Sequence, residues 1–153
     1  MRRVDRKLTE AESRDILQKG EFGTLSLVGS EGEPYGVPLS YVCIDESIYF
    51  HGSREGYKSE CIANDKRASF CVVANAKAYY DGGFSARYAS AVAYGDINEI
   101  CDPDEKKAVL HSLCFKYLPA HAANAVDAIE KTVERTAVWR LTPERVTGKA
   151  NKN

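Results

Sequence analysis

The segment YGVPLSYVCIDESIYFHGS, residues 35–53, is rich in β-branched and aromatic residues and is broken once by the polar run DES. Side chains of this kind favour extended backbone, and a short polar run between two such segments is typical of a hairpin. The segment therefore predicts two antiparallel strands, at 35–44 and 47–52. FGTLSLV (22–28) has the same character and predicts a strand before them, joined through the polar turn GSEGEP.

Three later segments also have strand character. They are RASFCVVANA (67–76), YASAVAYGDINEI (88–100) and TAVWRLT (136–142), and a polar tail, GKANKN, follows the last. Gly95 interrupts the second of them and predicts a bulge or bend, because a glycine inside a strand pattern usually marks one. The sequence thus predicts six strands.

Helices are predicted around these strands by their caps. In LTEAESRDILQKG (8–20), Thr9 and Glu12 have capping-box spacing. DPDEKKAVLHSLCFKYL (102–118) opens with Asp102 at the N-cap, Pro103 at the first helical position and Glu105 at the third. YKSECIAND (57–65) and ANAVDAIEKTVE (123–134) predict two further helices.

The order of these elements bounds the fold. Strands that follow one another, with helices at the ends and between the late strands, favour an antiparallel barrel over a doubly wound parallel sheet. A chain of 153 residues fits one domain and is long enough to bury a stable core without disulfides or metal ions. The prediction is a mainly β fold with flanking helices, a six-stranded antiparallel barrel in a single domain, 1–153.

Composition excludes several classes of function. Lys and Arg number 21 against 22 Asp and Glu, so no basic field points to nucleic acid. The start, MRRVDRKLTE, lacks the apolar core of a signal peptide, and no stretch has the length of a membrane span, so we expect a cytoplasmic protein without membrane contact. Five cysteines without a C-x-x-C pair predict neither a disulfide framework nor a metal site.

One stretch carries the residues of an anion site. IYFHGSREGYKSECI (48–62) ends a strand, turns through Gly52 and Ser53, and opens a helix containing Lys58. Free backbone amides at a helix start, the positive end of its dipole and a lysine suit a monophosphate. The alternative is a strand and a helix joined by an ordinary polar turn.

The segment GTLSLVGSEGEPYGVPLSYVCIDESIYFHGSREGYKSECIANDKRASFCVV (23–73) resembles the nitroimidazole-resistance (Nim) family of the pyridoxamine 5'-phosphate oxidase-like flavoproteins. The resemblance continues through residues 88–119 and through VWRLTPERVTGK (138–149). Its most specific pieces are YGVPLSYV, IYFHGS, the lysine after the turn and the closing GK. It implies an FMN-binding split β-barrel, in a homodimer with a flavin at each of two sites between the subunits.

The resemblance also implies a set of flavin-binding residues. The strand along which such proteins lay the flavin matches Val37, Pro38, Leu39, Ser40, Tyr41 and Val42. The next strand and the turn after it match Phe50, His51, Gly52 and Ser53, and the phosphate grip matches Tyr57 and Lys58. Ser90 matches a position that reaches the flavin from the partner subunit.

This sequence departs from the related oxidases at the phosphate. Tyr57 and Val37 stand where those enzymes have arginines, so fewer positive charges meet the phosphate, and Arg54 is a possible replacement. His51 matches a position at the flavin edge, where an imidazole suits hydrogen bonding or proton supply, although a strand-end histidine is also a common structural residue.

The function implied is an FMN-dependent oxidoreductase, a nitroimidazole reductase that passes electrons from NAD(P)H or another donor to a small aromatic substrate. One alternative is a pyridoxamine 5'-phosphate oxidase-like enzyme, although basic residues for a substrate phosphate are lacking. Another is a non-catalytic flavin- or haem-binding module, with His51 as the axial ligand in the haem case. Aromatic residues around DGG (81–83) predict either barrel packing or a pocket over the flavin. Trp139 is either a core anchor or part of the flavin pocket, and we favour the core.

Overall fold

A computed structural model describes residues 2–151 of the chain. Its strands are β1 (Phe22–Val28), β2 (Pro34–Ser40), β3 (Val42–Ile44), β4 (Ser47–Ser53), β5 (Arg67–Tyr80), β6 (Phe84–Glu99) and β7 (Thr136–Asn151). Its α-helices are α1 (Glu10–Lys19), α2 (Tyr57–Asn64), α3 (Pro103–Tyr117) and α4 (Ala125–Thr132). Two short 3₁₀ helices, η1 (Val4–Arg6) and η2 (Pro119–Asn124), precede α1 and α4.

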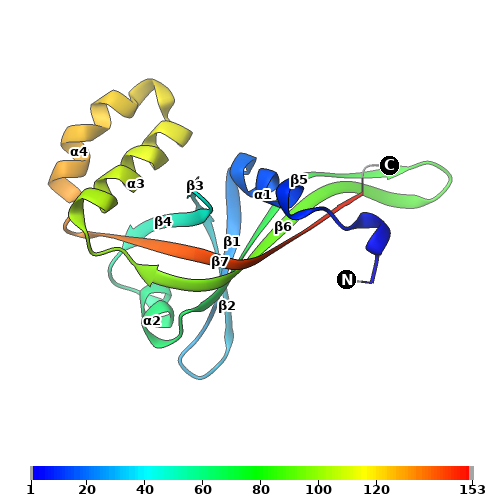
Figure 1. The fold of residues 1–153 in the computed structure, drawn as a ribbon, viewed down its shortest axis with the longest axis horizontal. Helices are drawn as coiled ribbons and strands as arrows, with labels where there is room; N and C mark the ends of the chain where they lie inside the picture. Colours follow the sequence, from blue (N-terminus) through cyan, green and yellow to red (C-terminus); the bar gives the residue numbers. More distant parts are fainter. Residues whose placement is uncertain (1, 152–153) are drawn as a thin grey trace.

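The strands form one antiparallel sheet in the order β2-β1-β5-β6-β7-β4-β3, curled into a split barrel (Figure 1). The predicted mainly β barrel with flanking helices is confirmed, but the count of six strands is wrong. The segment 35–44 is two strands, because β2 pairs with β1 at one edge of the sheet and β3 pairs with β4 at the other. The chain crosses between the two edges at Tyr41, whose side chain is fully buried.

Two long strands extend beyond their predicted bounds and form a projecting hairpin. The arm, as we call the tip of the β5–β6 hairpin (residues 77–87), extends away from the barrel (Figure 1). The predicted polar tail is also wrong as far as Asn151, because Gly148 to Asn151 continue β7 and pair with β6. The expected bulge at Gly95 is confirmed by a shift of the β6–β7 register between Tyr94 and Gly95.

The helices begin where their caps predict. The Thr9 hydroxyl accepts from the Glu12 backbone N–H at 3.2 Å, and the Glu12 carboxylate accepts from the Thr9 backbone at 2.9 Å. Asp102 caps α3 by accepting from the Glu105 N–H at 3.1 Å. Within residues 2–151, no helix combines the length and the apolar character needed to cross a membrane.

Two hydrophobic clusters fill the molecule. The first lies inside the barrel and contains Phe50, Phe70 and Trp139, which confirms Trp139 as a core anchor at 2% exposure. The second packs β3, β4 and β7 against the helical lobe, which is formed by α3 and α4 at one end of the barrel (Figure 1). Strand β4 separates the clusters, since Phe50 belongs to the first and Tyr49 to the second.

Candidate functional site

The end of β4 and the first turn of α2 bring a lysine against a glycine. Gly56 precedes α2 with a φ of 108°, a conformation that favours glycine, and Lys58 is the second residue of the helix. The Lys58 Nζ lies 4.5 Å from the centroid of the Trp139 ring. A Cβ on Gly52 would lie only 2.6 Å from that nitrogen, so the missing side chain makes room for the ammonium group.

The Lys58 ammonium is half-buried and has no carboxylate partner among the residues that the structure describes. Burial lowers the pKa of Lys58 from its ordinary value, because a charge removed from water is stabilised less well. A bound anion would compensate for that loss. The predicted anion site therefore contains a cation that packs on Trp139 and has no carboxylate partner in the described residues.

Two neighbouring residues direct their polar groups elsewhere. The Tyr57 hydroxyl donates to the Glu33 carboxylate, and its ring packs edge-on against Tyr35 with centroids 4.9 Å apart. Arg54 forms an ion pair with Glu99 at 3.2 Å and donates to a backbone carbonyl of the turn before β7 at 3.0 Å. The Arg54 charge is thus neutralised at β6.

His51 faces the other side of β4 from Lys58. Successive residues of a strand alternate between its faces, so Gly52 meets the lysine while His51 lies beneath the helical lobe. The imidazole is exposed and forms no hydrogen bond with residues 2–151. Desolvation by the surrounding protein, and secondly the Lys58 charge, lower the pKa of His51. Its imidazole is therefore neutral at neutral pH.

The strand predicted to lie along the flavin divides into two parts. Val37, Pro38, Leu39 and Ser40 belong to β2, an edge strand whose outer side has no strand neighbour in the described sheet. An unpaired strand edge offers backbone groups to a ligand.

The residues after Ser40 and the Phe50 side chain face the interior. Tyr41 is fully buried, its hydroxyl donates to the Leu17 carbonyl, and its backbone N–H donates to the Tyr117 hydroxyl at 2.9 Å. Val42 is 8% exposed and Phe50 fully buried, so their side chains belong to the two cores. A ligand at the surface could meet Phe50 only through its backbone.

Ser90 and the aromatic residues of the arm lie apart from this site within one chain. Ser90 is in β6, opposite Val73 and Lys149, and its hydroxyl donates to the Lys149 carbonyl at 3.4 Å. The rings of Tyr80 and Phe84 lie 5.1 Å apart at an angle of 55°. These residues are 68% and 95% exposed, so they neither pack in the barrel nor line the cavity beside His51.

A cavity of about 650 Å³, the lobe cavity, lies between the helical lobe and the barrel. His51 and Ser40 lie in its wall. The other residues that line it are Phe22, Leu110, Leu113, Cys114, Tyr117, Leu118, Ile129, Thr132, Arg135 and Thr136. Sequence reasoning missed this cavity, because its walls come from distant segments and no local motif joins them.

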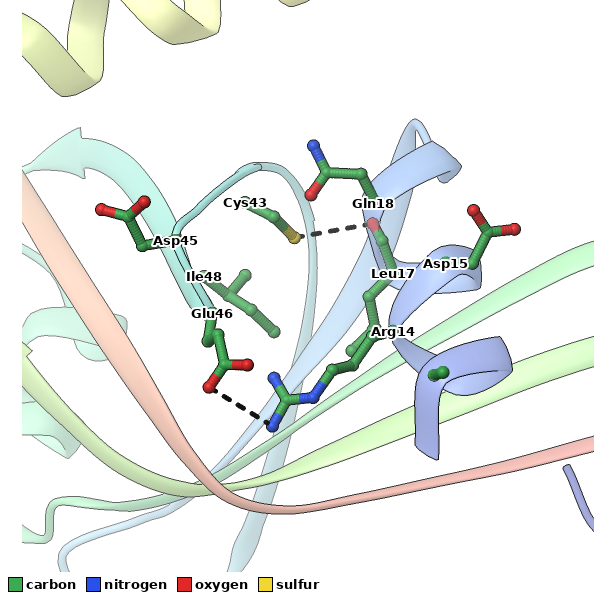
Figure 2. Close-up of a pocket in the computed structure, with 9 residues that line it drawn as sticks. Arg14, Asp15, Leu17, Gln18, Cys43, Asp45, Glu46 and Ile48 are labelled. Carbon is green, nitrogen blue, oxygen red and sulfur yellow. Dashed lines mark hydrogen bonds and ion pairs between the residues drawn. The ribbon is translucent and has the colours of Figure 1, made fainter. Parts of the chain in front are cut away.

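A second cavity, about 450 Å³, lies between α1 and the β3–β4 turn (Figure 2). Arg14 and Glu46 point toward each other across it with 4.0 Å between their charged atoms, and Arg14 also pairs with Glu10 at 2.8 Å. Cys43 donates to the Leu17 carbonyl at 3.6 Å, and burial raises its pKa to about 11. Because its charges are paired and its thiol is protonated, this second cavity is a weaker candidate for a functional site than the Lys58 site and the lobe cavity.

Comparisons with solved structures agree with this fold. The chain is similar to a candidate 5-nitroimidazole antibiotic resistance protein from Bacteroides thetaiotaomicron, with a TM-score of 0.78 and 22% identity over 94% of this chain and 85% of that one. The chain is also similar to a FAD- and haem-binding protein from Mycobacterium smegmatis, with a TM-score of 0.82 and 21% identity over 95% of this chain and 72% of that one. For a FAD-binding protein from Mesorhizobium loti, the TM-score is 0.65 and the identity 22%, over 96% of this chain and 98% of that one. At these identities the likeness shows the fold alone.

The family is shown by the sequence. A search of curated proteins found no match. A family model described as pyridoxamine 5'-phosphate oxidase, in contrast, matches residues 9–150, which include all the residues of the Lys58 site and of the lobe cavity. The chain therefore belongs to the pyridoxamine 5'-phosphate oxidase family.

Proposed function

We propose that this protein binds FMN and is an oxidoreductase of the nitroimidazole reductase type, which reduces a small aromatic acceptor with electrons from NAD(P)H or a similar donor. The observation that carries the proposal is Lys58, a half-buried ammonium without a carboxylate partner in residues 2–151, at the position that grips the phosphate in the family it resembles. Gly52 leaves space beside it, and an anion would restore its favoured charge.

The surrounding residues divide the work. Lys58 and the backbone amides of the turn before α2 would hold the phosphate, and the open edge of β2 would hydrogen-bond the ring along Val37 to Ser40. Bound FMN would supply the hydride from its reduced ring. His51, with a free imidazole in the wall of the lobe cavity, would orient the acceptor and donate a hydrogen bond to it.

A visible spectrum of the purified protein tests the cofactor. We expect the two-band spectrum of an oxidised flavin, and FMN in the extract after denaturation. After photoreduction under anaerobic conditions, addition of a nitroimidazole should restore the oxidised spectrum. A protein that binds no flavin when supplied with FMN would refute the proposal, and a flavin that no nitroaromatic compound reoxidises would remove the acceptor class.

A haem-binding module is the second candidate. The free imidazole of His51 beside an apolar cavity is the arrangement that an axial haem ligand needs. The same spectrum separates the two candidates, because haem gives an intense Soret band that flavin lacks. A Soret band lost in His51→Ala would favour the module over the reductase.

We also propose that the protein is a homodimer that shares its flavin sites, as the resemblance implies. The arm exposes the Tyr80 and Phe84 rings, and a second copy is the natural cover for an apolar projection of this kind. Ser90 lies outside the Lys58 site of its own chain and would reach a flavin only from a partner.

Light scattering tests the assembly. The holoprotein at low micromolar concentration should have about twice the chain mass of 16.9 kDa. Phe84→Asp, which places a charge at the tip of the arm, should shift the protein toward the monomer and release flavin with it. A monomer that retains its flavin would contradict the shared site.

A further inference from the structure

The lobe cavity combines apolar walls with positive charge. It is lined by seven apolar or aromatic side chains, counting Cys114 as apolar, and none of its lining residues is acidic. Its volume, about 650 Å³, is within the range typical of small-molecule sites. We propose that the lobe cavity binds a flat aromatic molecule carrying a carboxylate, and that Arg135 pairs with the carboxylate. The role of this molecule as the acceptor rests on the proposed function, whereas its binding does not.

The walls favour a planar apolar body. Leu110 and Leu113 of α3 are 7% and 5% exposed, and Ile129 of α4 is 6% exposed. The rings of Phe22 and Tyr117, which also line the cavity, lie 6.0 Å apart at an angle of 49°. Aromatic rings of a ligand pack well against surfaces of this kind.

Three of the six polar side chains in the wall already form hydrogen bonds within the protein. The Thr132 hydroxyl donates to the Ala128 carbonyl at 2.8 Å, and the Thr136 hydroxyl donates to the Thr132 carbonyl at 2.9 Å. The Tyr117 hydroxyl is engaged by the Tyr41 backbone. Three polar side chains in the wall lack a partner within the described chain, and they are those of Ser40, His51 and Arg135.

Arg135 is the one permanent charge among these three groups. Its backbone N–H donates to the Thr132 carbonyl at 3.1 Å, which anchors the turn between α4 and β7. Arg54 and Arg140 pair with Glu99 and Glu105 at 3.2 and 3.3 Å, but the Arg135 guanidinium has no carboxylate within ion-pair distance in residues 2–151. A guanidinium binds a carboxylate through two parallel hydrogen bonds. A ligand anchored there would share the cavity with His51, which also lines it.

Calorimetry with matched probes tests the site. We expect the holoprotein to bind 2-naphthoate about 10-fold or more tightly than 2-naphthamide, which has the same rings without the charge. Arg135→Met should reduce this preference to within about twofold. Lys131→Met is the matched control, because it removes one exposed positive charge from α4 outside the cavity wall and should leave the preference intact.

Several results would overturn the proposal. The proposal fails if neither probe binds, if both bind equally, or if the preference for naphthoate survives in Arg135→Met. It also fails if Lys131→Met abolishes the preference, because the preference would then arise from the overall positive charge of the region and not from Arg135. Thermal melting of the variants checks that both remain folded. The same titration on flavin-free protein separates the two hypotheses. If the protein binds naphthoate but takes up no flavin, the proposal for the lobe cavity is supported and the proposed reductase function is refuted. If it binds flavin but no naphthoate, the proposal for the lobe cavity is refuted and the reductase function stands.

Discussion

Replacing His51 by alanine should lower the rate of acceptor reduction by about 10²–10⁴-fold, the usual loss for a positioned acid, and leave the fold and FMN affinity nearly unchanged. The imidazole is exposed and bonded to no described residue, so its loss opens no core cavity. Lys58, which we expect to hold the phosphate, faces the other side of β4. Binding and chemistry are therefore separable in this variant.

The need for a proton donor follows from the balance of the first reduction step. One hydride and one proton convert a nitro group into a nitroso group and water. Negative charge develops on the nitro oxygens as the hydride arrives, and a hydrogen bond from His51 would stabilise it. The pKa of His51 is lowered by desolvation and by the Lys58 charge, so the imidazole acts as a neutral N–H donor at neutral pH.

The pH dependence separates orientation from proton delivery. If His51 delivers the proton, the rate should rise as the pH falls through its lowered pKa, because only then does the imidazolium form before the acceptor binds. His51→Gln keeps a hydrogen-bond donor but cannot titrate. It should show no such rise at low pH, and it should retain most of the rate only if orientation is the role of the histidine.

Single-turnover oxidation of the photoreduced holoprotein by a nitroimidazole measures these rates without the donor half-reaction. His121→Ala is the matched control, because His121 lies exposed in η2 and outside the lobe cavity. It should react like the parent protein. Equal rates in the parent, His51→Ala and His51→Gln would show that His51 takes no part in the reduction.

Elements with local signals were predictable from the sequence. The caps at Thr9 and Asp102 are formed by residues three positions apart, so the chain encodes them without reference to its partners. The hairpin of β3 and β4 and the bulge at Gly95 were predictable for the same reason. The position of Lys58 after a strand and a turn was predictable because β4, the turn and α2 are consecutive.

Features that depend on pairing between distant segments were not predictable. Residues 35–44 have uniform strand character, and only the change of pairing partner at Tyr41 divides them into β2 and β3. The segment GKAN (148–151) has the composition of a polar tail, and it is a strand only because it pairs with β6. Nothing in the sequence singled out Arg135, because only the fold brings it into one cavity with residues of β1, α3 and α4.

Replacing Lys58 by alanine should weaken FMN binding by about 1.5–3 kcal/mol, the scale of a hydrogen bond between charged groups, and leave riboflavin binding unchanged. Riboflavin has the same ring and ribityl chain but no phosphate, so the ratio of the two affinities isolates the phosphate contact. Quenching of flavin fluorescence on titration of the apoprotein measures both constants. Lys66→Ala is the matched control, since Lys66 is an exposed lysine outside α2 and should alter neither affinity.

Gly52→Ala tests the contact between Lys58 and the phosphate without changing the lysine itself. The added Cβ would lie 2.6 Å from the Lys58 Nζ, and the lysine can relieve this clash by moving its flexible end, so the fold survives while the ammonium is displaced. We expect a loss of FMN affinity that approaches the loss in Lys58→Ala, and no further loss when the two substitutions are combined, because both remove one contact.

The charge of Lys58 also gives the contact a pH signature. Burial lowers the Lys58 pKa in the free protein, and a bound phosphate would raise it by favouring the ammonium form. FMN affinity should therefore be complete below the free-protein pKa and fall as the pH rises through it, while riboflavin affinity stays level over the same range. An FMN affinity that is parallel to that of riboflavin at every pH, and equal in the parent protein and Lys58→Ala, would show that the phosphate is held elsewhere.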